Sequence, residues 1–402
     1  MQPILILGLP FEFILFGATL LGVALLHHRT LTVALTGLIA IAAYKFLFTG
    51  FDGHPGLEGA GLHFAHHWVE LANLGLLLLG FAILSRTFEQ SGLPDLAPDI
   101  LPDGWLAGLA LLALTFVLSA FLDNIAGALI GATIAAHVYQ KRVHIGFLAA
   151  IVAASNAGGS GSVVGDTTTT MMWIAGKSPM DVLHAYVGAV PAFLVFAIPA
   201  ALAQEKHQAA LKHDVGGIKA DWLRVAIVVA MLVTAVGANV LANIYAPDLL
   251  HAIPVIGLAL WAAIVATAVL RTPDWKVLPE AFTGAVFLLA LVLAASMMPV
   301  ENLPAPSWQS ALGLGFISAI FDNIPLTALA LQQGGYDWGV LAYAVGFGGS
   351  MLWFGSSAGV AVANMFPEAK SAIAWLRAGW LIPLAYVVGF VVLIALLGWR
   401  PH

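Results

Sequence analysis

Two pairs of short motifs contain residue types that bind small cations. Asp123-Asn124-Ile125 recurs as Asp322-Asn323-Ile324, and each triplet interrupts an apolar segment. A second string, GGSxxxxG, starts at Gly158 and recurs at Gly348. Carboxylate, hydroxyl, amide and carbonyl oxygens are hard ligands that suit small hard cations. These motifs therefore predict a cation-binding site rather than a catalytic site.

The candidate cation- and proton-binding residues all lie in or beside these motifs. They are Asp123, Asn124, Ser155, Asn156, Ser160, Asp166, Thr167, Thr168, Asp322, Asn323, Ser350, Ser356 and Ser357. No Lys or Arg interrupts the motifs, although sites for anions usually enlist one. Protons and cations would compete for the carboxylates, because a dehydrated site favours either protonation or a bound counter-charge. The residues favour exchange of sodium or lithium for protons.

Some of these residues and their neighbours have an alternative role. Asn124 and Asn323 can simply cap the helices that follow them, and Thr169 and Thr170, beside the candidate ligands, can bond back to helix carbonyls. The glycines of the breaks are expected to serve close packing and loop geometry rather than direct binding. They are Gly158, Gly159, Gly165, Gly348, Gly349 and Gly355.

The elements that position these residues must be membrane helices. Of 402 residues, 61% are hydrophobic and 9% are charged, whereas roughly a quarter of an average soluble domain is charged. The chain has no cysteine, which excludes disulfides, thiolate metal sites and cysteine nucleophiles. Basic residues do not cluster as in nucleic-acid-binding proteins. We expect the lipid bilayer as the surroundings, no nucleic-acid partner and no cofactor.

The paired motifs indicate an internal duplication. We predict an all-α polytopic membrane protein of two inverted repeats, each with three scaffold helices, a re-entrant hairpin, an interrupted helix and a final helix. That is about ten transmembrane segments plus two hairpins. Five crossings in each half would invert the second copy in the bilayer. Helix breaks survive in a membrane only against protein or a watery cavity, so the breaks predict a binding cavity.

The predicted boundaries follow from runs of roughly 20 apolar residues. In the first repeat, 1–203, scaffold helices occupy 4–86 (at 4–26, 30–49 and 67–86), the hairpin 105–140, the interrupted helix 144–175 and the final helix 182–203. A cytoplasmic linker covers 204–222. In the second repeat, 223–402, scaffold helices occupy 223–299 (at 223–245, 251–270 and 277–299), the hairpin 307–335, the interrupted helix 338–366 and the final helix 371–398.

Charge in the loops predicts the orientation. With both termini outside, twelve Lys and Arg residues fall on the inner face and only Lys177 and Arg400 on the outer face. The inner set is Arg29, Arg86, Lys141, Arg142, Lys206, Lys212, Lys219, Arg224, Arg271, Lys276, Lys370 and Arg377. This asymmetry obeys the positive-inside rule, and we expect the membrane to be a bacterial-type inner membrane.

A separate cluster raises the possibility of a metal site. His63, His67 and Glu70 are spaced i, i+4 and i+7, which places them on one face of a helix. A metal enzyme built on this face is a rival function, but the stretch lacks the HExxH string and a second acid at ligand spacing. Interfacial anchoring of the histidines is the simpler interpretation, and we expect no enzyme activity.

Residues of both halves resemble a known family. The strings NAGGSGSVVGDTTTTMMWI and GGSMLWFGSSAGVA, with the two DNI triplets, resemble the NhaD-type sodium/proton antiporters of the ion-transporter superfamily, relatives of the arsenite-efflux and citrate transporters. The resemblance covers roughly 65–395. It implies an elevator-type transporter, often a homodimer through its scaffold helices, in which hairpins and interrupted helices move. It also implies a site of Asp123, Asn156, Asp166, Thr167 and Asp322, supported by Ser155, Ser350 and Ser356.

The sequence departs from the family pattern in two ways. Ser162-Val163-Val164-Gly165-Asp166 lacks the proline that often follows the serine in the first break. Ser356 stands where the first copy has Asp166, which suggests one dominant cation site nearer the first half. Two other cargoes stay open. A citrate or carboxylate symporter would need a basic residue such as Arg377 or Lys45 at the site, and an arsenite-type efflux permease would show no sodium dependence.

Overall fold

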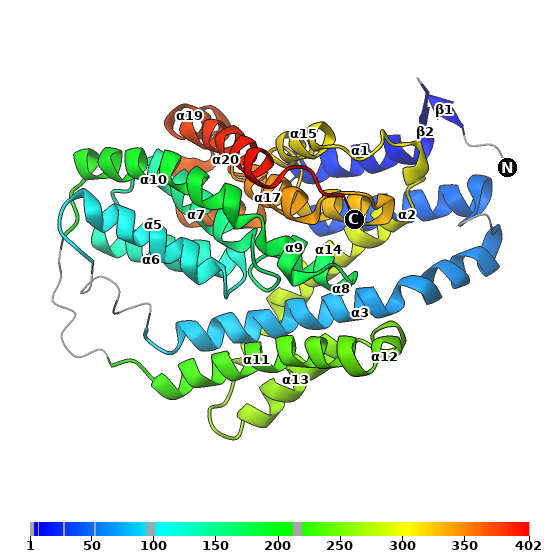
Figure 1. The fold of residues 1–402 in the computed structure, drawn as a ribbon, viewed down its shortest axis with the longest axis horizontal. Coiled ribbons are helices and arrows are strands. Elements are labelled where there is room, and N and C mark those ends of the chain that lie inside the picture. The colour runs from blue at the N-terminus through cyan, green and yellow to red at the C-terminus, as the bar shows by residue number, and fades with distance from the viewer. Residues whose placement is uncertain are drawn as a thin grey trace. The chain divides into compact units, whose positions relative to one another are not determined.

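The computed structural model describes residues 4–6, 8–26, 29–51, 54–93, 96, 101–211 and 219–401 (Figure 1). These residues are mostly helical. The sheet formed within them is a two-stranded hairpin in which β1 (Leu5–Ile6) pairs antiparallel with β2 (Leu9–Pro10). The first helix, α1 (Phe11–Leu25), therefore begins seven residues later than the predicted span 4–26. Pro10 has no N–H to donate to an upstream carbonyl, so it suits the position before a helix.

By internal contacts the chain forms two compact units. The first unit contains Met1–Leu84, Ile227–Ala305 and Ile324–Gly334. The second contains Ser85–Ala226, Pro306–Asn323 and Gly335–His402. Each unit therefore combines segments from both predicted repeats.

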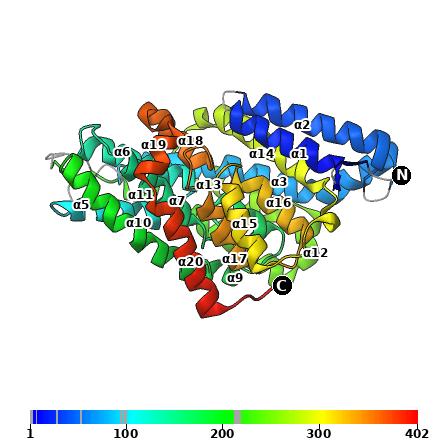
Figure 2. The ribbon, with the colours of Figure 1, turned by 90° about the horizontal axis from the view of Figure 1, so that it is seen from above.

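The first unit holds the long apolar helices. In it α2 (Thr30–Tyr44) continues as a π-helix over Lys45–Thr49 and contacts both α1 and α14 (Leu278–Ser296) (Figure 2). Most of α3 (Gly56–Glu89) lies in this unit, and its Asn73 accepts a hydrogen bond from the N–H of Gly257 in α13 (Val255–Thr267) at 2.7 Å. The unit also contains most of α11 (Trp222–Tyr245), α12 (Pro247–Ala252), most of α16 (Asn323–Gln333), and 3-10 turns at Trp275–Val277 and Val300–Asn302.

The second unit is built around two buried helices. Every residue of α7 (Ile145–Gly159) except the first is buried, as is every residue of α17 (Trp338–Gly348). Helices that are apolar on all sides belong in such an interior. α7 contacts α5 (Trp105–Ser119), α6 (Asn124–Val138) and α10 (Tyr186–His207), as Figure 1 shows. The other helices are α8 (Thr167–Ile174), α9 (Pro179–Leu183), α15 (Trp308–Ser318), α18 (Ser357–Met365), α19 (Ala372–Ala378) and α20 (Leu381–Leu397), with a 3-10 turn at Pro367–Lys370.

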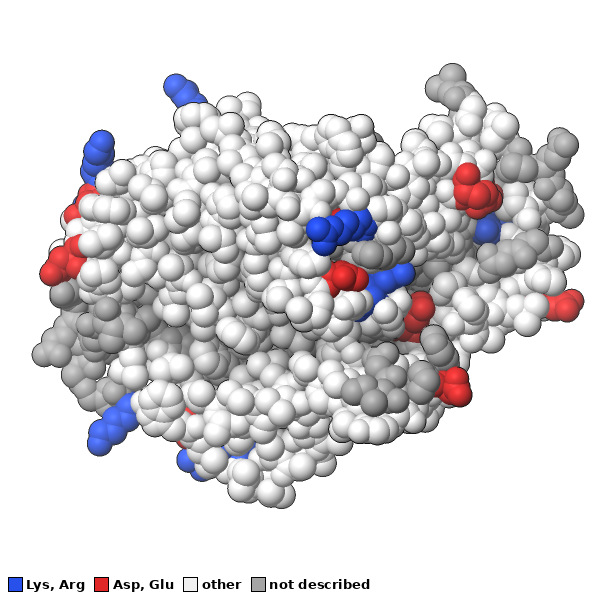
Figure 3. Space-filling model, in the orientation of Figure 1, with Lys and Arg blue, Asp and Glu red and all other residues white. Residues whose placement is uncertain are grey.

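Several helices are long enough to span a membrane. Among the described residues, five helices are long and apolar enough to cross a membrane, or six if a bent pair counts as one span. The face in Figure 3 is correspondingly poor in charge, with few Lys, Arg, Asp or Glu side chains visible. By contrast α5 and α6 have 15 residues each, and α15 and α16 have 11 each. A full crossing needs about 20.

Three predicted spans have different bounds in the structure. The span predicted at 67–86 is part of a helix of 34 residues that begins at Gly56. The span predicted at 251–270 is divided at Pro254 between α12 and α13. The final span, predicted at 371–398, bends by 60° between α19 and α20. Pro383 explains this bend, because proline cannot donate to the carbonyl of Gly379 four residues earlier.

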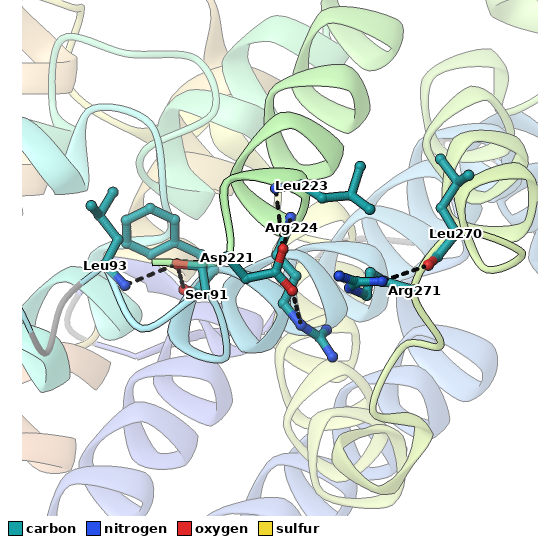
Figure 4. Close-up of polar contacts among 8 residues, drawn as sticks. Ser91, Leu93, Asp221, Leu223, Arg224, Leu270 and Arg271 are labelled. Carbon is teal, nitrogen blue, oxygen red and sulfur yellow. Dashed lines mark hydrogen bonds and ion pairs between the residues drawn. The ribbon is translucent and has the colours of Figure 1, made fainter. Parts of the chain in front are cut away.

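The predicted linker 204–222 is partly helical. α10 continues to His207, 212–218 lie outside the described residues together with Lys212, and α11 begins at Trp222. In the second unit the N–H of Asp221 donates to the carbonyl of Ser91 at 2.7 Å, and the Asp221 carboxylate lies 3.7 Å from Nε of Arg224 (Figure 4). The predicted external ends of the chain, 1–3 and 402, also lie outside the described residues.

Candidate cation-binding site

The two interrupted helices break in the same way and end their breaks on equivalent caps. α7 resumes as α8 after Asp166, and α17 resumes as α18 after Ser356. Both residues are N-caps with nearly identical backbones, φ −146° and ψ 140° for Asp166 against φ −146° and ψ 153° for Ser356. A side-chain oxygen at this position satisfies an N–H that the helix leaves unpaired. The carboxylate therefore caps one break and a hydroxyl caps the other.

Asp166 is the most thoroughly coordinated acid of the site. Its side chain is 2% exposed. Oδ1 accepts hydrogen bonds from the N–H and the hydroxyl of Thr168, both at 2.9 Å. Oδ2 accepts from Nδ2 of Asn124 at 3.2 Å and from Nδ2 of Asn323 at 3.5 Å. All these donors are neutral, so the hydrogen bonds hold the carboxylate in place without neutralising its charge.

Asn156 connects the two halves of the site. Its Nδ2 donates to the hydroxyls of Ser350 at 3.0 Å and Ser356 at 3.1 Å. Its Oδ1 accepts from Nδ2 of Asn124 at 3.1 Å. Asn156 is fully buried, and a buried polar side chain is normally satisfied in this way. Residues of both predicted breaks and of the first hairpin therefore share one hydrogen-bond network.

The other two acids lie at the ends of the hairpin breaks. Asp123 precedes α6 and makes no side-chain cap, whereas Asp322 precedes α16 and accepts a hydrogen bond from the hydroxyl of Ser357 at 3.1 Å. Both are partly exposed. The charge of Asp166 acts on Asp123, and the charge of Asp322 acts on Asp166. The structure thus brings the three predicted acids into one electrostatic cluster.

The glycines of the breaks allow backbone to approach backbone. A Cβ on Gly158 would lie 2.0 Å from the carbonyl oxygen of Phe116, and a Cβ on Gly348 would lie 2.2 Å from that of Gly315. A Cβ on Gly165 would lie 2.1 Å from the carbonyl oxygen of Ser119, and a Cβ on Gly355 would lie 2.5 Å from that of Ala319. Gly159 and Gly349 approach the backbones of Gly165 and Gly355. No larger residue fits here, so these glycines set the geometry of the site.

Sequence reasoning missed Gly346. It occupies in the second string the position that Asn156 occupies in the first, ten residues before Ser356 and Asp166 respectively. A Cβ on Gly346 would lie 3.2 Å from Cβ of Ser160 and 3.5 Å from Oδ2 of Asp166. The second half therefore packs bare backbone close to the Asp166 carboxylate and Ser160, at the position where the first half has an asparagine side chain. Alignment of the two strings beyond the GGS triplet was the signal that could have found it.

Several predicted ligands have local roles in the structure. The Ser160 hydroxyl donates to the carbonyl of Ala157 at 2.8 Å. Ser155 donates to the carbonyl of Asn124 and lies 2.7 Å from the hydroxyl of Ser119, which ties α7 to the hairpin. Thr169 and Thr170 bond back to the carbonyl of Asp166 at 2.8 and 3.0 Å. Thr167 is partly exposed at the start of α8.

The two basic residues considered for an anionic cargo have other surroundings. Lys45 is buried in the first unit, where Nζ donates to the carbonyl of Met297 at 2.8 Å. Arg377 lines a cavity with Lys141, His144 and His207 in the second unit. In the part of the chain that the structure describes, the hydrogen-bond donors to Asp166 are amides and a hydroxyl.

The histidine cluster is not arranged as a metal site. Nδ1 of His67 lies 3.3 Å from Oε2 of Glu70, whereas Nε2 of His63 lies 3.0 Å from the hydroxyl of Ser296. Within the described ranges no group of three His, Asp or Glu side chains is placed to hold a metal ion. His63 uses its ring nitrogen to join α3 to α14 instead.

Comparison with known proteins identifies relatives that match most of the chain. A family model described as "Citrate transporter" matches residues 11–348. "Sodium/proton antiporter 1" of Arabidopsis thaliana is 27% identical over 399 residues, which cover 88% of this chain and 66% of the plant protein. "Na(+)/H(+) antiporter NhaD" of Alkalimonas amylolytica is 27% identical over 361 residues, 74% of this chain and 72% of that protein. The Vibrio parahaemolyticus protein of the same name is 26% identical over 377 residues, 78% of this chain and 87% of that protein.

Proposed function

Since the chain belongs to the citrate transporter family, we propose that it is a secondary transporter that exchanges sodium or lithium ions for protons. The family comprises multi-pass membrane transporters rather than enzymes, and the cargo ions need no further cofactor. The relatives named sodium/proton antiporters confirm the resemblance to NhaD-type proteins noted in the sequence. The nature of the cargo is the proposal.

One observation carries the choice of a cation. Asp166 is buried and interacts electrostatically with Asp123 and Asp322. The hydrogen-bond donors described around it are all neutral. Three carboxylates gathered in this way repel one another until a proton or a cation binds. A cation bound beside Oδ2 of Asp166 would relieve this repulsion. Protonation of the same carboxylate would relieve it equally, so the two ligands exclude each other.

Exclusive binding of a proton or a cation is sufficient for exchange. If access changes from one side to the other only when the site is occupied, each cation carried one way is matched by protons carried the other way. We propose an elevator-type movement of the segments that carry the site. The division of the chain into two compact units supports this proposal, because all the residues of the cation site lie in the second unit.

The arrangement of the helices in the membrane is also a proposal. We propose inverted repeats, re-entrant hairpins at α5–α6 and α15–α16, and both termini outside a bacterial-type inner membrane. The short hairpin helices support the re-entrant arrangement, and the equivalent caps at Asp166 and Ser356 support the duplication. A homodimer through the scaffold helices is proposed from family resemblance.

A carboxylate symporter is the second candidate, and the family description favours it. Citrate carries several negative charges and would need cationic partners at its site. The neutral donors around Asp166 argue against such a cargo. An arsenite-type permease has no comparable support, because a neutral cargo leaves the acid cluster without a role.

The cargo is tested in sealed proteoliposomes with an imposed pH gradient and an internal pH-sensitive dye. We expect sodium or lithium to dissipate the gradient, and potassium or citrate to leave it intact. Dissipation by citrate together with sodium, but not by sodium alone, would replace exchange with symport. Empty liposomes and liposomes with Asp166→Asn provide the controls.

A further inference from the structure

The second unit contains a basic cavity away from the acid cluster. A cavity of about 770 Å³ opens between the α6–α7 loop, the end of α10 and α19. Among the described residues, its charged lining consists of Lys141, Arg142 and Arg377 against the carboxylate of Glu368, with His144 and His207 beside them. Cavities of this size hold small-molecule groups, and the excess of cationic side chains selects an anion.

The basic cavity adjoins an apolar crevice. A second cavity of about 190 Å³ shares His144, Ala378 and Trp380 with the first and continues along α7, α10 and the start of α20. Phe196, Pro199 and Ile382 are among its apolar lining residues. Ala378, Gly379, Trp380 and Leu381, which line the crevice, lie where α19 and α20 meet at a bend of 60°. A ligand that fills both cavities must have an anionic end and an apolar end.

The basic cavity is held in a fixed shape by buried contacts. Gln204 is fully buried, its Oε1 accepts from the N–H of His144 at 2.8 Å, and its Nε2 donates to the carbonyl of Arg142 at 3.1 Å. Lys141 has a positive φ of 61° and so turns the loop sharply at the cavity. On the opposite wall, a Cβ on Gly146 would lie 2.5 Å from the carbonyl oxygen of Ala378. α7 and α19 are therefore in direct backbone contact at the cavity.

We propose that these adjoining cavities bind an anionic phospholipid, with the phosphate at Lys141 and Arg377 and an acyl chain in the apolar crevice. Basic pockets between membrane helices bind such head groups. The ligand would also reach the transport machinery. Trp375 of α19 is fully buried, and its Nε1 donates to the carbonyl of Ser350 at 3.3 Å. A lipid that contacts α19 and holds it in place would therefore also stabilise the second break of the cation site.

The experiment measures lipid binding to the purified full-length chain by native mass spectrometry. The probes are dioleoylphosphatidylglycerol, dioleoylphosphatidylcholine and soluble glycerol phosphate. We expect preferential retention of phosphatidylglycerol, weakened about fivefold by each charge removed in Lys141→Ala and Arg377→Ala. Lys206→Ala is the matched control, since Lys206 is exposed next to His207 but does not line the cavity. Equal retention of both lipids, or equal loss in the control, would overturn the proposal.

A second pair of variants tests the acyl-chain part. Ala203→Trp fills the apolar crevice, whereas Leu202→Trp places the same ring on a neighbouring residue that is 40% exposed and outside the crevice. We expect only the first substitution to reduce phosphatidylglycerol binding. If glycerol phosphate competes fully with the lipid at equal concentration, the cavities bind a soluble anion and the lipid proposal fails. Because the readout is binding, the result does not depend on which cargo is transported.

Discussion

Asn156→Ala is the perturbation that most directly tests whether the two breaks act as one site. The substitution removes the hydrogen bonds to Ser350 and Ser356 and the one accepted from Asn124. At roughly 1 kcal/mol for each neutral hydrogen bond, the loss is about 3 kcal/mol. If the cation-bound state depends on all three contacts, the affinity for sodium falls by up to about a hundredfold. If the contacts are partly lost in the unbound state as well, the fall is smaller but still about tenfold.

The assay is the sodium concentration that gives half-maximal thermal stabilisation of the purified protein, measured alongside the stability without sodium. Asn73→Ala is the matched control, because Asn73 is also a buried asparagine and accepts a hydrogen bond from Gly257 in the first unit. Both variants should unfold at lower temperature, and only Asn156→Ala should shift the sodium dependence. An unchanged sodium midpoint in Asn156→Ala would refute the role of this network in cation binding.

Three further substitutions follow from the geometry of the breaks. Gly346→Ala should cost about 1 kcal/mol of stability through overpacking and weaken sodium binding several-fold, since its methyl would lie 3.5 Å from Oδ2 of Asp166; unchanged sodium-dependent exchange would place the cation elsewhere. Gly158→Ala should abolish the folded protein in size-exclusion chromatography, since its Cβ would lie 2.0 Å from the carbonyl oxygen of Phe116, whereas Gly284→Ala has open space and should be tolerated. Thr168→Val removes the hydroxyl that lies 2.9 Å from Oδ1 of Asp166 and should reduce exchange in proteoliposomes. Thr36→Val is the control: it removes an exposed hydrogen bond within its own helix and should leave exchange unchanged.

The positions of the helix breaks could be predicted from the sequence because their causes are local. A glycine pair followed by serine, or an aspartate in an apolar run, leaves a visible interruption in a hydrophobic pattern. The breaks at Asp123, Asp166, Asp322 and Ser356 therefore precede helix starts as the pattern indicates. The acids of the two DNI triplets and Asp166 also interact in the structure, although the second string has Ser356 where the first has Asp166.

Other features depend on tertiary contacts that no local pattern records. Gly346 lies inside a uniformly apolar helix, and its importance comes from the neighbouring Asp166 and Ser160. The hydropathy of 371–398 hides the bend between α19 and α20, which Gly379 and Pro383 signal. Lys45, near the end of the predicted span 30–49, is buried and donates to the carbonyl of Met297. A long side chain near a span end can reach the membrane surface or be buried, and the choice is made by packing.

The most direct measurement is the number of protons released when sodium binds to the detergent-solubilised protein without any gradient. Calorimetric titration with sodium chloride in two buffers of different ionisation enthalpy gives this number. We predict net proton release for the native protein over the pH range in which the acid cluster is partly protonated, and none for Asp166→Asn. Sodium binding without proton release at every pH, or release that persists in Asp166→Asn, would contradict competition between the two ions at Asp166.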